Sequence, residues 1–261
     1  MAGSLRLAGG MGALVDGLVQ NLPIERLLQD ARVTHLAEVF GGLSATIMHA
    51  GVPRQISPRR VVFALPPRII ARTIEFQTAL SDVHRRTLLE IPTWMAGQTK
   101  ILAVHDEAHW RKAGLSGDAM SQSGPMVELH DASPHAGGPS AVFGFVGIPA
   151  AQRFGNQEAL ITAAKAQLVA CLGPKMAAPR DILLQDWAQV PEIATDIDHP
   201  PLRAHPQYGL PTALRDLATS GISFASTETA HGFGGYLEGA LDAAERVAGE
   251  LLAVGSSRAV P

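Results

Sequence analysis

A carboxylate and a glycine-rich turn stand next to each other near the end of the sequence. The apolar run Ile222 to Ala225 is followed by Glu228, by the turn Gly232 to Gly235, and by a helical pattern from about Leu237. This order predicts a strand, a turn and the start of a helix. Helix N-termini carry free N–H groups and a partial positive charge, so the junction can hold a phosphate, a carbonyl oxygen or an anionic ring. Spacing alone favours the plainer interpretation, a tight turn before a packed helix.

Three further polar side chains stand where they can serve chemistry. Lys100 lies inside the apolar run Thr99 to Val104. A lysine there is either at a sheet edge with its amine in water, which is commoner, or buried beside a polar site with a lowered pKa. Tyr208 and Tyr236 are the only two tyrosines. One follows a proline-rich stretch and the other ends the glycine turn, so spacing alone predicts amphipathic surface side chains.

Metal and serine chemistry have little support in the sequence. His105 and His109 are four residues apart, but they follow a predicted strand, so the spacing does not bring them to one face and no metal site is expected. Ser116, Ser121 and Ser123 lie in a glycine-rich loop without a nucleophile-elbow pattern. Serine hydrolase chemistry therefore has no support in the sequence.

A short glycine motif opens the sequence. Gly10-Met-Gly12 is similar to the beginning of a dinucleotide-binding fingerprint, but Val15 stands where the third glycine belongs. We interpret the motif as a chance pattern. Binding of a nicotinamide or flavin nucleotide through it stays a minor alternative, which a Gly10→Ala variant would test.

Composition limits the partners and the compartment. The 261 residues are 46% hydrophobic and 17% charged, typical of a folded protein. The net charge is −3 and no basic run exceeds two residues, which argues against nucleic-acid and membrane-surface binding. The single cysteine, Cys171, lies among apolar residues and is expected to be a buried thiol in a reducing compartment. No run approaches membrane-spanning length, so we expect a soluble, cytoplasmic protein.

Hydrophobic periodicity predicts the elements that position these residues. A turn is expected at Gly9 to Gly12, and the first strands are expected to form a small meander that feeds a buried central strand ending at Pro66. The fold class is α+β, with mixed sheets and helices in two layers. Helices are predicted at Ala13 to Asn21, Ser81 to Glu90, 157 to 172 and from Leu237; strands are predicted at Leu5 to Leu7, Arg32 to Leu36, Ala45 to His49, Arg60 to Leu65, Thr99 to His105, Met126 to His130, Ala141 to Val146, Asp181 to Trp187 and Ile222 to Ala225.

Taken together, these residues resemble the flavin-dependent amine oxidase family, which includes monoamine oxidases, polyamine oxidases and L-amino acid oxidases. The most specific match is the C-terminal block, which resembles the family's second FAD-binding signature. The resemblance spans roughly Leu5 to Leu252. It is carried by Phe224 to Glu228, Gly235 to Ala240, Glu245-Arg246, the strand and loop Val61 to Pro67, the Lys100 strand, Trp110-Arg111 and Trp187.

The resemblance implies roles for the catalytic residues. Lys100 matches the lysine that holds a water near flavin N5. Tyr208 and Tyr236 match the aromatic pair that sandwiches the substrate amine. The implied reaction is oxidation of a C–N bond of a small amine to an imine, with oxygen as the acceptor and peroxide as a product. Gln207 stands where covalent-flavin members have cysteine, so the implied FAD is noncovalent.

The resemblance also implies cofactor contacts. Trp187 would lie beside the isoalloxazine, Glu228 would contact the ribityl or diphosphate region, and Val33 would contact the adenine through its backbone. Gly235, Tyr236 and Leu237 would present helix N–H groups to the pyrimidine carbonyl of the flavin, where negative charge collects on reduction.

The family's N-terminal Gly-x-Gly-x-x-Gly unit has no counterpart here, and Ser226 replaces a usual glycine. The resemblance therefore implies a partial FAD-binding domain at 1–88, a substrate-binding domain at 89–186 and a second FAD-binding segment with the C-terminal helix at 187–261. One hypothesis is an amine oxidase component that needs a second chain carrying the missing unit. The alternative is a truncated, inactive remnant or binding module.

Overall fold

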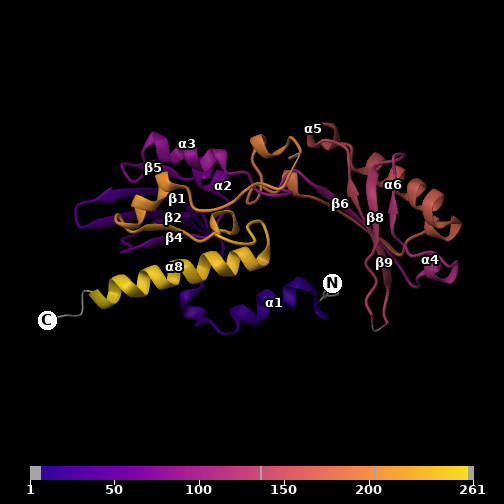
Figure 1. The fold of residues 1–261 in the computed structure, drawn as a ribbon, viewed down its shortest axis with the longest axis horizontal. Helices are drawn as coiled ribbons and strands as arrows, with labels where there is room; N and C mark the ends of the chain where they lie inside the picture. Colours follow the sequence, from indigo (N-terminus) through magenta and orange to yellow (C-terminus); the bar gives the residue numbers. More distant parts are fainter. Residues whose placement is uncertain (1–6, 136, 203, 258–261) are drawn as a thin grey trace.

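The computed structural model describes residues 7–135, 137–202 and 204–257, which form two lobes (Figure 1). Two crossing segments join the lobes, one between α3 and β6 (91–98) and one between β10 and α7 (187–202 and 204–211). The helices are α1 (Gly10–Val19), α2 (Pro67–Thr73), α3 (Asp82–Glu90), α4 (His109–Lys112), α5 (Ala150–Arg153), α6 (Gln157–Leu172), α7 (Thr212–Arg215) and α8 (Leu237–Ser257). The strands are β1 (Ala31–Val39), β2 (Gly42–His49), β3 (Val52–Ile56), β4 (Val61–Phe63), β5 (Glu75–Gln77), β6 (Thr99–His105), β7 (Ala119–Met120), β8 (Met126–Asp131), β9 (Ser140–Val146), β10 (Asp181–Asp186) and β11 (Ile222–Phe224).

The first lobe combines a mixed sheet with a separate parallel pair. The sheet has the order β3-β2-β1-β5, with β5 parallel to β1, and β11 pairs with β4 in parallel. Its core includes Leu36, Ile70 and Leu88, together with Phe63 and Phe224, whose rings stack at 5.8 Å. The parallel pair leads directly to the glycine turn and α8, so its packing sets where that turn lies.

The second lobe is a five-stranded antiparallel sheet of order β10-β6-β9-β8-β7. Alternate residues of β6 are buried, and Ile101 and Ala103 pack in one core with Leu168 of α6. Lys100 therefore projects from the opposite face of the sheet, as expected from the two-residue period of a strand. Phe145, its direct partner in β9, shares that face.

Buried ion pairs fasten the two crossing segments. Arg153 donates to both carboxylate oxygens of Asp186, at 3.0 and 2.7 Å, and to the carbonyl oxygen of Gly97. Arg68 of α2 donates to Asp198 at 2.6 Å. Separating such a pair would leave a buried charge without its partner, which is costly. The two pairs therefore hold the crossing segments in place.

The α+β class is confirmed, and β6 and α6 have the predicted bounds. The expected central strand at Arg60 to Leu65 is wrong: β4 ends at Phe63, and Val62 and Leu65 are exposed. The third strand of the meander is instead β3, which contains Pro53, a residue that an edge strand tolerates. The apolar composition of this run predicted burial along its whole length. Phe63 is buried, but the chain leaves the strand after it, because Pro66 and Pro67 lead into α2.

The N-terminal prediction also needs correction. Gly10 to Gly12 form the first turn of α1 rather than a loop before a helix, and α1 ends at Val19. Most of the strand expected at Leu5 to Leu7 lies outside the described residues, and Leu7 itself is in no strand. Cys171 is partly buried against the core of the second lobe rather than fully buried. Among the described helices, none is long and apolar enough to cross a membrane.

Candidate functional site

Four aromatic rings gather where the crossing segments meet the glycine turn. The imidazole of His205 stacks on Tyr236, with ring centroids 5.4 Å apart and an angle of 11° between the rings. It meets Tyr208 edge-on at 5.6 Å and lies 4.9 Å from Trp94. The two predicted tyrosines, distant in sequence, therefore belong to one cluster through His205.

The glycine turn allows this cluster to form. A Cβ on Gly234 would lie 2.5 Å from Tyr208, and one on Gly235, whose φ is +82°, would lie 3.1 Å from both Tyr208 and His205. Only glycine adopts that backbone region without strain. The hydroxyl of Thr227 accepts the N–H of Gly235 at 2.9 Å and donates to the carbonyl of Tyr236 at 2.7 Å, which fixes the turn at the start of α8.

The two tyrosines differ in their surroundings. The Tyr208 hydroxyl donates to the carbonyl oxygen of Pro92 at 2.8 Å, and burial, with the nearby charge of Glu228, raises its pKa above the usual range. Tyr208 is therefore a neutral, fixed wall. Tyr236 is 57% exposed and offers an accessible aromatic face.

Glu228 is the buried carboxyl of the site. Its residue is only 3% exposed, and it lies in a short 3-10 helix, Thr227–Thr229, just after β11. Burial raises the pKa of this carboxyl, and its own backbone and the nearby Ser226 and Thr93 hydroxyls offset that only in part. A carboxyl with a raised pKa beside a cavity is typical of a ligand-binding position.

Glu228 and Val33 line two neighbouring cavities. One of about 590 Å³ is lined by Val62 of β4, by the segment 225–228 that follows β11 and ends in Glu228, and by one face of α8; a second of about 520 Å³ is lined by Val33 of β1. Leu65 belongs to the lining of both. The two cavities are therefore neighbours on either side of Leu65, one beside Glu228 and the other beside Val33.

Lys100 lies on an inner strand, because β6 pairs with both β10 and β9. Its ammonium is 4.8 Å from the ring centre of Phe145 and 5.9 Å from that of Phe143, so cation–π contacts hold it. Trp187, half-buried, begins a short 3-10 helix after β10, and its N–H donates to the carbonyl of Gln98 at 2.9 Å. Among the described ring contacts, neither residue reaches the cluster around His205.

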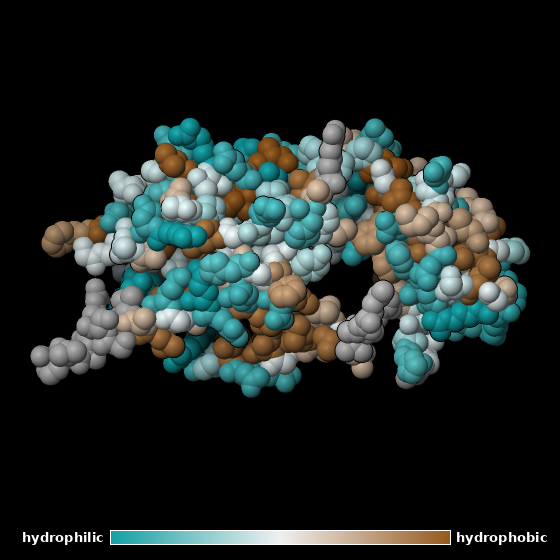
Figure 2. All heavy atoms as spheres, viewed as in Figure 1, coloured by the Kyte–Doolittle hydropathy of each residue, from teal (hydrophilic) through white to brown (hydrophobic). Residues whose placement is uncertain are grey.

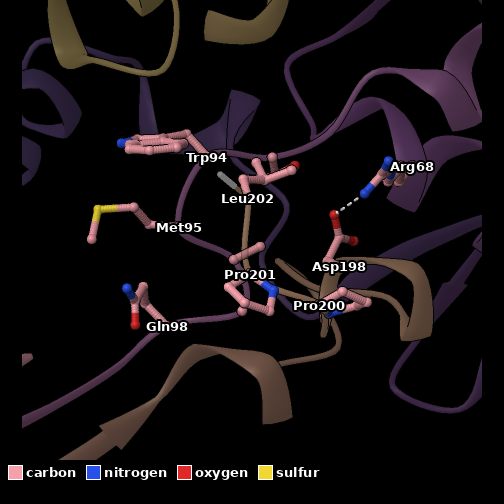
Figure 3. A pocket seen from close by; sticks show the side chains of 11 residues that line it. Arg68, Trp94, Met95, Gln98, Asp198, Pro200, Pro201 and Leu202 are labelled. Atoms are coloured by element: carbon pink, nitrogen blue, oxygen red, sulfur yellow. Dashed lines mark hydrogen bonds and ion pairs between the residues drawn. The ribbon is translucent and has the colours of Figure 1, made fainter. Parts of the chain in front are cut away.

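A smaller cavity of about 70 Å³ lies between the crossing segments (Figure 3). The Arg68–Asp198 pair forms one wall, and the indole of Trp94 lies on the other side, away from that pair. Trp94 and His205 are the site residues that sequence reasoning missed. Both stand in irregular segments, where no periodicity predicts which way a side chain points.

The interpretation of the histidine pair also changes. The rings of His105 and His109 meet at 5.8 Å, because the chain turns directly into α4, so these two side chains do come together. Burial, followed by the charge of His109, lowers the pKa of His105. In the described part of the chain, no group of three or more His, Cys, Asp or Glu side chains could hold a metal ion.

Comparisons with known proteins identify the family of the chain. The family described as flavin containing amine oxidoreductase matches residues 1–252. A probable flavin-containing monoamine oxidase A of Dictyostelium discoideum is 25% identical, with 94% of this chain and 53% of that protein covered. A putative flavin-containing monoamine oxidase of Mycobacterium tuberculosis is 28% identical, with 95% and 52% covered.

Solved structures show the same fold. A putrescine oxidase bound to putrescine matches with a TM-score of 0.70 and 21% identity, covering 94% of this chain and 53% of that one. Cyclohexylamine oxidase from Brevibacterium oxydans matches with a TM-score of 0.71 and 21% identity, covering 92% and 52%. The chain thus spans about half the length of the relatives it matches.

Proposed function

Because the chain belongs to the family of flavin-containing amine oxidoreductases, we propose that it is a component of an FAD-dependent amine oxidase. The observation that carries this proposal is the cluster of Tyr208, His205 and Tyr236 at the glycine turn before α8. Two aromatic walls at a helix start suit a neutral amine held in front of a flat, electron-accepting ring. The proposed substrate is a small amine.

The residues present fit FAD at its ring and ribityl end. Glu228 is buried beside the larger cavity, and Val33 lines the second cavity, as contacts to the ribityl and adenine parts require. Leu237 begins α8, whose partial positive charge favours an electron-rich carbonyl. Gly235 and Tyr236 stand directly before it, and their N–H groups donate to Thr227 and to the carbonyl oxygen of Phe233, so the predicted N–H contact from these two residues is replaced by the dipole of the helix. We assign Trp187 to the wall beside the ring system. Gln207 supplies no thiol, so the proposed FAD is noncovalent.

In this proposal each side chain has one task. Bound FAD would supply the redox chemistry, the oxidation of an amine C–N bond to an imine with oxygen as the acceptor. Tyr208 and Tyr236 bind and orient the amine, and their apolar faces favour its neutral form, because a charged form loses hydration there. Lys100 positions a water from the open face of the second lobe.

The proposal includes a second chain that carries the Gly-x-Gly-x-x-Gly unit. The parallel pair β4–β11 supports it, because parallel sheets are normally covered on both faces, whereas Val62 and Leu65 are exposed here. Helix α1 has no buried residue, and Leu18 is 58% exposed. Hydrophobic side chains gather at the edge of the molecule where α1 lies (Figure 2). Apolar surfaces of this kind mark interaction sites.

The test is co-expression with the N-terminal flavin-binding half of a relative, followed by assay of peroxide with a panel of amines. We expect peroxide from the pair and none from either part alone. Activity should fall with Tyr208→Ala and Lys100→Met. A pair that associates but makes no peroxide with any amine would contradict the proposal. A cytoplasmic location is proposed from the single cysteine.

A second candidate function is a binding module or inactive remnant. The exposed apolar side chains of α1 and β4 favour it, since a truncated product would expose the surface where the other half packed. The two proposals differ over FAD. A remnant would take up none, alone or with a second chain.

A further inference from the structure

We infer that His205 determines amine selectivity, because its imidazole fills the space between Tyr208 and Tyr236 until an amine with an aromatic ring displaces it. This inference rests on the proposed amine site and names the substrate class that the site prefers. His205 was not among the residues that the sequence pointed to.

The position of the imidazole carries the first step. It lies parallel to Tyr236 at 5.4 Å and perpendicular to Tyr208 at 5.6 Å, so one flat ring contacts both tyrosines at once. Trp94 closes a third side at 4.9 Å. A substrate held between the tyrosines needs this same space, and the two cannot share it.

The second step is that His205 can leave. It is exposed and belongs to the irregular segment between β10 and α7. Its side-chain bond runs from Nδ1 to the carbonyl oxygen of Pro206 at 2.9 Å. A carbonyl oxygen only accepts, so Nδ1 carries the hydrogen and Nε2 faces the Gly235 turn, 3.1 Å from where a Cβ would stand. The imidazole is held by this exposed hydrogen bond and by its contacts with the neighbouring rings. The aromatic ring of an incoming amine can make those ring contacts in its place.

The third step concerns selectivity. An aromatic ring restores the stacking on Tyr236 that is lost when the imidazole leaves, whereas a flexible aliphatic chain does not. Displacement therefore penalises aliphatic amines more than aromatic ones. We therefore expect an amine such as benzylamine to bind more tightly than butylamine. The ratio of the two affinities depends on His205.

Binding to the purified chain tests the inference without flavin. The two tyrosines give a simple isotope-labelled spectrum, and benzylamine is titrated against wild type, His205→Ala and His205→Phe. We expect His205→Ala to bind benzylamine roughly tenfold more tightly than wild type, because the contacts of one aromatic ring contribute a free energy of that size. The variant should also lose the preference for benzylamine over butylamine. His205→Phe keeps a ring in place and should bind no more tightly than wild type.

His231→Ala is the matched control, since His231 is exposed at the same glycine turn and should leave affinity unchanged. Thermal unfolding of each variant checks folding. The inference is overturned if His205→Ala binds benzylamine no more tightly than wild type, whether both bind or neither does. It is also overturned if His205→Phe gains as much as His205→Ala. The proposed function is judged separately, by flavin uptake and peroxide in the paired protein, so the two failures are distinguishable.

Discussion

Gly235 shows how one residue decides the geometry of the candidate site. Its φ of +82° and the 3.1 Å approach of Tyr208 and His205 leave no room for a side chain. Gly249, in the middle of α8, has nothing within 4 Å of the position a Cβ would take. The two glycines therefore have opposite expected responses to the same substitution.

Gly235→Ala is expected to destabilise the protein by about 1–2 kcal/mol, the cost of a left-handed backbone with a Cβ. Gly249→Ala is expected to stabilise it by about 0.5–1 kcal/mol, because alanine favours a helix. Urea unfolding of both variants measures this difference. Equal effects at the two positions would show that the turn is not held as described.

Glu228 gives a pH-dependent prediction. Its pKa is raised on folding from the ordinary 4.5, so the folded protein binds the proton more tightly than the unfolded chain. The contribution of Glu228 to the free energy of unfolding is fully present below about pH 4.5, and it is lost as the pH rises through the pKa of the folded state. Glu228→Gln should therefore gain stability over wild type as pH rises through that window.

Urea unfolding at several values between about pH 4 and pH 8 checks this. Exposed Glu245 on α8 supplies the control, and Glu245→Gln should show no such trend. A gain for Glu228→Gln that stays constant with pH, or shrinks as pH rises, would contradict the raised pKa.

At the scale of elements, the ion pair of Arg153 and Asp186 holds α5, β10 and the crossing segment at Gly97 together. Arg153→Met leaves a buried carboxylate without its partner, so we expect a loss of about 3–5 kcal/mol. Arg180→Met removes exposed pairs with Asp106 and Asp181 and should cost about 0–1 kcal/mol. Thermal unfolding compares them, and similar losses would refute the structural role of the buried pair.

The elements also show what the sequence could predict. The periods of β6 and α6 were clear because each packs one face against a single core, so their bounds followed from the pattern. β4 is shorter than its apolar run, since Pro66 redirects the chain, and β3 was missed because Gly51 and Pro53 are typical of a turn. The hydrophobic pattern therefore predicts which face of an element is buried, but it does not predict which strands pair.

Only the family motifs pointed to residues of the candidate site. Tyr208, Tyr236 and Glu228 came from the resemblance, and the structure places them around one turn. His205 and Trp94 belong to irregular segments whose side-chain directions depend on distant contacts, such as the Arg68–Asp198 pair. Local sequence carries no record of those contacts.

At the scale of the whole molecule, the chain spans about half of its relatives and carries exposed apolar residues on α1 and β4. The cavities at Glu228 and Val33 share Leu65 in their linings. We propose that a second chain with the missing nucleotide-binding unit covers this surface and that FAD lies across the two neighbouring cavities.

Flavin retention tests this account most directly. The chain is co-expressed with the N-terminal flavin-binding half of a relative, the pair is purified, and the FAD released by denaturation is measured against protein. We predict stoichiometric FAD in the pair, none in either part alone, and loss of both assembly and FAD in Leu18→Lys, whose side chain is exposed on α1. A stable pair free of FAD would contradict the account.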